Sequence, residues 1–78
     1  MADHAGLVPH VEVYDNGTVK LRGSHLDGAM HGDWVFYRRD GSLMRTGSFN
    51  RGTQVGVWRT HDRTGAVIKE TRFRERTA

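Results

Sequence analysis

Hydrophobic and polar residues alternate along most of this chain with a period of two. His10-Val11-Glu12-Val13-Tyr14 is the first such segment, and Val19 and Leu21 continue the alternation in the second. No window repeats apolar residues at the i, i+3, i+4, i+7 spacing of an amphipathic helix, whereas a period of two is typical of half-buried strands. The pattern predicts strands over 10–14, 18–25, 33–38, 42–49, 55–61 and 66–73.

Glycines recur at a spacing of 24 residues. Gly17, Gly41 and Gly65 form one series, and the two tryptophans are separated by the same distance. Segments 17–37 and 41–61 share six residues, five of which are glycine or tryptophan. A fixed period of this length indicates stacked supersecondary units. We therefore predict an all-β fold, an antiparallel meander of about six strands in a single twisted sheet built from β-hairpin repeats.

The turn glycines predict the hairpin connections. They end the loops Asp15-Asn16-Gly17, Arg39-Asp40-Gly41 and Arg63-Thr64-Gly65. A two-residue type I′ turn needs positive φ at both central residues, which β-branched Thr64 resists. A three-residue loop with only the glycine in the left-handed region fits all three. It predicts the opposed pairs Val13–Val19, Val11–Leu21, Tyr37–Leu43, Phe36–Met44, His61–Val67 and Thr60–Ile68.

Alternation from these pairs predicts apolar groups on both sides of the sheet. One face is expected to carry Val11, Val13, Val19, Leu21, Val35, Tyr37, Leu43, Phe49, Val57, Val67 and Phe73. The other is expected to carry Trp34, Phe36, Met44, Trp58 and Ile68. Gly23 and Gly47 fall inside strands, where a glycine allows an aromatic ring to lie across the bare backbone. The tryptophan-bearing face is then folded over by twist or left for a partner.

Composition limits the chain to one small domain. It has 78 residues, a formal net charge of +3 and no cysteine, so disulfides and thiolate metal sites are excluded. We expect a flexible N-terminus over 1–9, the repeat domain over 10–73 and a basic tail over 74–78. No apolar run approaches the roughly 20 residues that span a bilayer, and no signal peptide is visible. These features predict a cytoplasmic protein.

Candidate catalytic chemistry is sparse. The five histidines lack the close pairing of zinc sites, and His25 and His31 are the nearest useful pair. Asp27 and Asp33 become Arg51 and Val57 one repeat later, as expected of variable loop positions. The glycines precede no helix that could hold a phosphate. We therefore predict no enzyme activity, no catalytic residue, no metal, no cofactor and no small-molecule substrate.

Binding to another macromolecule is the remaining class of function. The predicted partner-binding residues are Trp34, Phe36, Met44, Trp58, Arg72 and Arg74. For the two tryptophans the alternatives are a repeat core and an exposed anchor for a protein. Basic and aromatic residues also allow binding to a nucleic acid or an anionic membrane. A third alternative is a homo-oligomer, a self-assembling structural element joined through open sheet edges.

The repeat resembles the MORN-type repeat, a hairpin repeat of glycines and aromatics. Gly32-Asp33-Trp34-Val35-Phe36-Tyr37 followed by Gly41 is similar to the bacterial variant. The second copy, Gly56-Val57-Trp58-Arg59-Thr60-His61 followed by Gly65, departs from it at His61. Members of that variant are often identified as antitoxins of the YwqK type, immunity partners of secreted toxins. The resemblance implies an extended antiparallel sheet that contacts proteins, and therefore a non-catalytic protein–protein interaction module.

Overall fold

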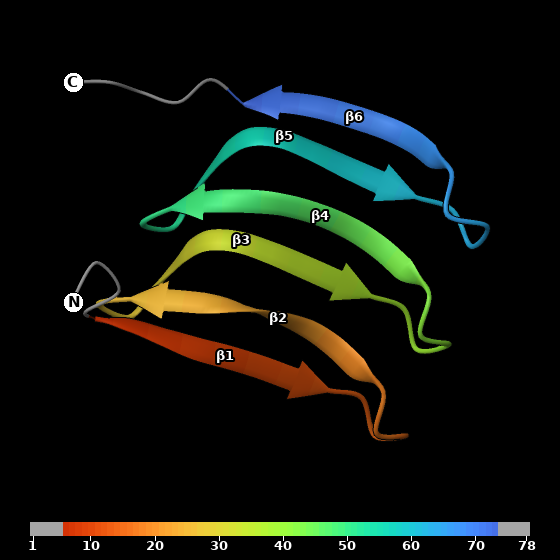
Figure 1. Ribbon diagram of the computed structural model, residues 1–78, viewed down its shortest axis with the longest axis horizontal. Coiled ribbons are helices and arrows are strands. Elements are labelled where there is room, and N and C mark those ends of the chain that lie inside the picture. Colours follow the sequence, from red (N-terminus) through yellow and green to blue (C-terminus); the bar gives the residue numbers. More distant parts are fainter. Residues whose placement is uncertain (1–5, 74–78) are drawn as a thin grey trace.

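The computed structural model describes residues 6–73, which form one open antiparallel sheet (Figure 1). Its strands follow one another in chain order, so that each pairs with its sequence neighbours. Those residues contain no helix, and none therefore that could cross a membrane. The predicted six-stranded all-β meander is confirmed. The strands are β1 (Leu7–Val13), β2 (Val19–Leu26), β3 (Ala29–Tyr37), β4 (Leu43–Asn50), β5 (Thr53–His61) and β6 (Val67–Phe73).

Strand β1 starts earlier than the sequence pattern indicated. It begins at Leu7 and includes Pro9, so residues 7–9 are strand rather than part of a flexible terminus. Proline is tolerated here because β1 is an edge strand with a partner on one side only. The predicted basic tail, 74–78, lies outside the described residues.

Three-residue loops, at 15–17, 39–41 and 63–65, connect β1 to β2, β3 to β4 and β5 to β6, and one residue on each side separates each loop from the strands. In the first, Tyr14 N donates to the carbonyl of Thr18 (2.8 Å) and Gly17 N to that of Tyr14 (3.0 Å), and the other two repeat this pattern. Gly17, Gly41 and Gly65 have φ of 87°, 90° and 96°. The glycine alone is left-handed in each loop, as the sequence predicts, because it has no Cβ to clash with the backbone.

The register departs from prediction just after these loops. The first pairs are as expected: Val13–Val19, Tyr37–Leu43 and His61–Val67. A β-bulge then inserts one extra residue, Lys20, Met44 or Ile68, into the second strand of each hairpin. The predicted pairs Val11–Leu21, Phe36–Met44 and Thr60–Ile68 are therefore wrong. The observed pairs are Val11–Arg22, Phe36–Arg45 and Thr60–Lys69.

The bulges also correct the predicted faces. A one-residue slip moves every later side chain to the other side of a strand. Phe49 and Phe73 were expected on the valine side, but both contact the indole of Trp58, with ring centroids 5.1 and 6.4 Å away. Leu21 lies opposite Phe36 and so shares this face. The tryptophan side therefore gathers more aromatic rings than the sequence pattern predicted.

The core is a single layer of indoles lying on the sheet. Trp34 and Trp58, 1% and 5% exposed, are the buried large apolar residues among 6–73. A Cβ placed on Gly23 would stand 2.1 Å from Trp34 Cδ2, and one on Gly47 would stand 2.0 Å from Trp58 Cδ2. The prediction that these strand glycines admit a ring is confirmed. Trp58 Nε1 also donates to the carbonyl of Ser48 (3.1 Å), so the buried indole N–H group of Trp58 has an acceptor.

Candidate binding site on the tryptophan face

Two cross-strand rows of side chains define what we call the tryptophan face. Residues that oppose each other across antiparallel strands point to the same side. In β1 to β6 order, the first row is Glu12, Leu21, Phe36, Arg45, Thr60 and Lys69. The second row is His10, Gly23, Trp34, Gly47, Trp58 and Thr71. The first row thus starts with a carboxylate and ends among cations, and the second alternates rings with small residues.

The rings of this face contact one another along the sheet. Trp34 lies between the imidazole of His25, with centroids 5.5 Å apart, and the ring of Phe49, 6.0 Å away. Phe36 lies 6.3 Å from Trp34 and 6.0 Å from Trp58. Such contacts bury the indoles without a second layer of structure. The aromatic chain ends at Phe73 on β6, where the surface opens.

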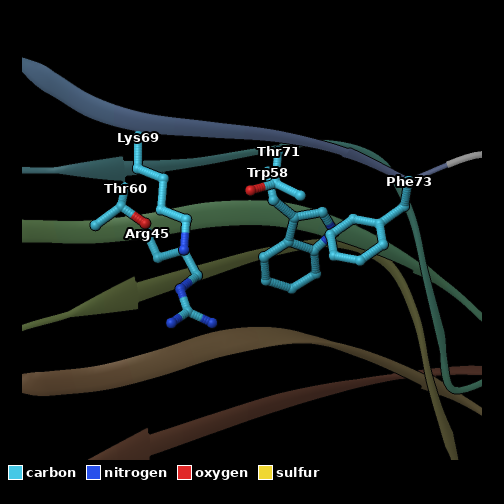
Figure 2. Close-up of a pocket in the computed structure, with 6 residues that line it drawn as sticks. All are labelled: Arg45, Trp58, Thr60, Lys69, Thr71 and Phe73. Carbon is cyan, nitrogen blue, oxygen red and sulfur yellow. The ribbon is translucent and has the colours of Figure 1, made fainter.

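A hollow of about 140 Å³ lies at this open end of the face. Figure 2 shows Arg45, Thr60 and Lys69 on one side of it and Trp58, Thr71 and Phe73 on the other. Arg45, Thr60 and Lys69 are neighbours in the first row and come from β4, β5 and β6. We call this hollow the basic hollow. It combines two cations, two hydroxyls and two aromatic rings, a set suited to an anionic group attached to an apolar body.

The two cations of the basic hollow have no carboxylate partner within residues 6–73. The ion pairs found there join His10 to Glu12, Arg39 to Asp15, Arg59 to Glu70, and Arg63 to Asp40. Arg45 instead holds its guanidinium 5.9 Å from the centre of the Trp58 ring. A cation over an indole face is attracted by the ring quadrupole but keeps its N–H groups free for an acceptor. Arg45 is therefore available to an anion from outside the chain.

A histidine pair occupies the opposite end of the face. His10 and His25 have ring centroids 4.7 Å apart, and His10 Nε2 lies 2.8 Å from a carboxylate oxygen of Glu12. The hydrogen bond from His10 lowers the pKa of Glu12. The sequence singles out His25 and His31 as the nearest pair, but the imidazole in contact with that of His25 is the ring of His10. Within residues 6–73 no group of three or more His, Asp or Glu side chains is placed to hold a metal ion.

The predicted partner-binding residues do not form one surface. Trp34, Phe36 and Trp58 share the tryptophan face, but both indoles are buried. Met44 is a half-buried bulge residue with no partner across the strand. Arg72 opposes Val57 and lines a separate hollow with it. Arg74 lies outside the described residues. Of this set, Phe36 is the residue that lies on the tryptophan face and is also partly exposed.

Of the residues that line the basic hollow, the partner-binding set predicted from the sequence contains only Trp58. The available signal was departure from the repeat, because Arg45 and Lys69 occupy the position at which the first unit has Leu21. Thr71 likewise stands where earlier strands have Gly23 and Gly47. Residues that break a structural repeat at exposed positions are free of its packing constraint. They are therefore reasonable candidates for function.

Comparison with known proteins found no match to the chain among family models, curated proteins or solved structures. The antiparallel meander and its basic hollow thus rest on the geometry described above.

Proposed function

We propose that this protein is a non-catalytic protein-interaction module whose recognition site is the basic hollow. The observation that supports this most directly is the pair of cations, Arg45 and Lys69, which have no carboxylate partner within residues 6–73 and lie beside the rings of Trp58 and Phe73. An acidic side chain of a partner would bind between the cations. An adjacent apolar side chain would pack on Phe73, whose ring is part-exposed.

The tryptophans support this site from below rather than contact the partner. With exposed fractions of 1% and 5%, Trp34 and Trp58 offer little ring surface to a ligand. Their part is to hold β2 to β5 rigidly, because each indole lies in the space left by a glycine on the preceding strand. A rigid sheet holds the side chains of a binding site more precisely than a loop does.

A finer proposal is that the partner is a toxin and the protein a cytoplasmic MORN-type antitoxin. The support is the twice-matched glycine and tryptophan spacing, which resembles the bacterial MORN variant. The basic hollow makes this proposal more specific, since it requires an acidic surface on the toxin. A toxin that binds nucleic acid through a basic groove does not meet that requirement, because like charges repel.

Nucleic-acid binding remains the second candidate, and the cations of the hollow favour it. Single-stranded nucleic acids bind by stacking bases on exposed aromatic rings and by contacts to phosphates. Burial of both indoles removes the largest stacking surfaces, which is why a protein partner is preferred. The two candidates differ in salt response, because phosphate binding releases counterions and weakens steeply as salt rises.

Site-specific photo-crosslinking in the native cells tests the proposal. A photoreactive amino acid at Thr60, beside the basic hollow, is compared with one at Thr46, a half-buried threonine of the other face. We expect one protein to be crosslinked at position 60 and not at position 46. Crosslinks removed by nuclease would favour the nucleic-acid candidate. Equal labelling at both positions would contradict a site at the hollow.

Binding of the purified partner is then measured for two charge-reversal variants. Arg45→Glu lies in the basic hollow, whereas Arg22→Glu makes the same charge change on the opposite face. We expect Arg45→Glu to weaken binding about thirtyfold, or roughly 2 kcal/mol, and Arg22→Glu to change it less than threefold. A loss of equal size in both variants would show that only net charge matters.

A further inference from the structure

The exposed large apolar side chains of residues 6–73 all lie on the two edge strands. They are Val8, Val11, Val13, Val67 and Ile68. The outer edges of β1 and β6 also present backbone groups without a neighbouring strand. An open edge of this kind is a template for a further strand. The strands run in opposite directions (Figure 1), so β1 of one molecule can lie antiparallel to β6 of another.

The repeat period specifies how a strand would be added to β6. In β4 and β5, Arg45 lies opposite Thr60, and the pair one repeat earlier has the same register. Lys69 comes one repeat after Arg45, and Glu12 lies two repeats before Thr60. A β1 strand added in the register of the repeat therefore brings Glu12 opposite Lys69. The first row of the tryptophan face would continue across the junction with a carboxylate beside an ammonium group.

The second row fits the same junction. Trp34 and Trp58 lie on glycines of the preceding strands, but β6 has Thr71 at the equivalent position. A side chain there excludes a third indole, because even a Cβ on Gly47 would approach Trp58 to 2.0 Å. Strand β1 has His10 at the tryptophan position, and an imidazole is smaller than an indole. At the two edge strands, therefore, a threonine replaces the glycine in β6 and a smaller ring replaces the tryptophan in β1.

Pro9 does not prevent this pairing. The residues equivalent to Pro9 one and two repeats later are Asp33 and Val57. Both lie in a β-bulge and have no cross-strand partner in β2 or β4. A residue without an N–H group therefore removes no hydrogen bond from the junction. Val8 replaces the glycines of positive φ that make this bulge in β3 and β5. We accordingly expect the ladder to form around Val11 and Glu12 and to be short.

We propose that this chain associates head to tail, with β1 of a second copy added to the β6 edge and Glu12 placed opposite Lys69. The contact is heterologous, so it leaves one β1 edge and one β6 edge free and can repeat. This inference goes beyond the proposed recognition of a partner and uses the edges of the sheet, although it shares Lys69 with the basic hollow.

Sedimentation velocity over a range of concentrations up to about 1 mM tests the association. Lys69→Glu and Glu12→Lys each place like charges at the junction, and we expect each to weaken association about tenfold. Arg22→Glu is the matched control, since it reverses a charge on the opposite face. Circular dichroism verifies that the variants stay folded. A wild-type protein that remains monomeric over the whole range would overturn the proposal.

Charge exchange distinguishes this junction from other contacts. In an equimolar mixture of Lys69→Glu and Glu12→Lys, every junction between the two variants pairs a carboxylate with an ammonium group, and the mixture should restore association to the wild-type level. The double variant should self-associate like the wild type. Sensitivity to Lys69→Glu alone would point to a contact between two β6 strands and refute the head-to-tail arrangement. An unchanged association in every variant would also refute it.

Discussion

Trp34 and Trp58 occupy equivalent positions in successive repeats, yet their surroundings differ. Trp34 has aromatic neighbours on both sides, His10 and His25 toward β1 and Phe36 and Phe49 toward β5. Trp58 has phenylalanines and then the basic hollow. The comparison shows that a repeat position fixes the backbone and the ring, while the next strand decides whether that ring is enclosed or borders a site.

The largest expected effect concerns the feature that both repeats share, an indole packed on a strand glycine. We predict that Gly47→Ala destabilises the protein by about 3 kcal/mol, most of the stability of so small a domain, because the new methyl would overlap Trp58. Urea unfolding followed by circular dichroism measures the loss. Gly17→Asn is the control, since nothing lies within 4 Å of that glycine's missing Cβ and asparagine tolerates positive φ.

A double-mutant cycle identifies the cause of that loss. If overlap with the indole is responsible, Gly47→Ala should cost at least 1 kcal/mol less in a Trp58→Leu background than in the wild type. Equal costs in the two backgrounds would show that the alanine acts through the backbone of β4, and not through the ring.

The second prediction separates the two tryptophans. Trp34→Phe should destabilise the protein by about 2 kcal/mol, and Trp58→Phe by about 1 kcal/mol. A smaller ring at position 34 leaves a void among packed rings, whereas one at position 58 enlarges a hollow already open to water. Acrylamide quenching gives an independent measure. Trp58 in Trp34→Phe should be quenched more readily than Trp34 in Trp58→Phe, and the reverse order would contradict the comparison.

Much of the fold could be predicted from the sequence because glycine spacing is a backbone property. Positive φ at Gly17 and a ring over Gly23 both follow from the missing Cβ, which the sequence states directly. The bulges could not be predicted in this way. Lys20, Met44 and Ile68 are chemically unlike one another, and a bulge depends on how two strands twist together rather than on one residue type.

The error at the bulges propagated to the candidate site. Because each slip exchanges the faces, Phe49 and Phe73 were expected among the valines, and the extent of the aromatic chain was hidden. Arg45 and Lys69 were missed for a related reason, since their convergence with Thr60 is a matter of cross-strand register. Departures from the repeat at positions 45, 69 and 71 were visible in the sequence, but only the register gives them a common face.

The smallest expected effect concerns the loops of the two units. Asn16 accepts a hydrogen bond from Thr18 N in the first loop (3.0 Å), and Asp40 accepts the equivalent bond from Ser42 N in the second (2.8 Å). Asp40 also accepts bonds from the Ser42 hydroxyl and from Arg63 Nε (2.7 Å each). Chiefly the Ser42 bonds, with a contribution from Arg63, hold the pKa of Asp40 well below its ordinary value of 3.8.

Asp40→Asn copies the first loop into the second and removes this titration. A carboxyl whose folded pKa is lowered stabilises the protein above its unfolded pKa and loses that contribution as pH falls below about 4. The variant should therefore be slightly less stable than the wild type at pH 7, and the difference should shrink as the pH falls from about 4 toward 2. Urea unfolding at both values measures it. A constant difference across this range would mean that the amide weakens the loop by its geometry, so that Asn16 and Asp40 differ in shape and not in charge.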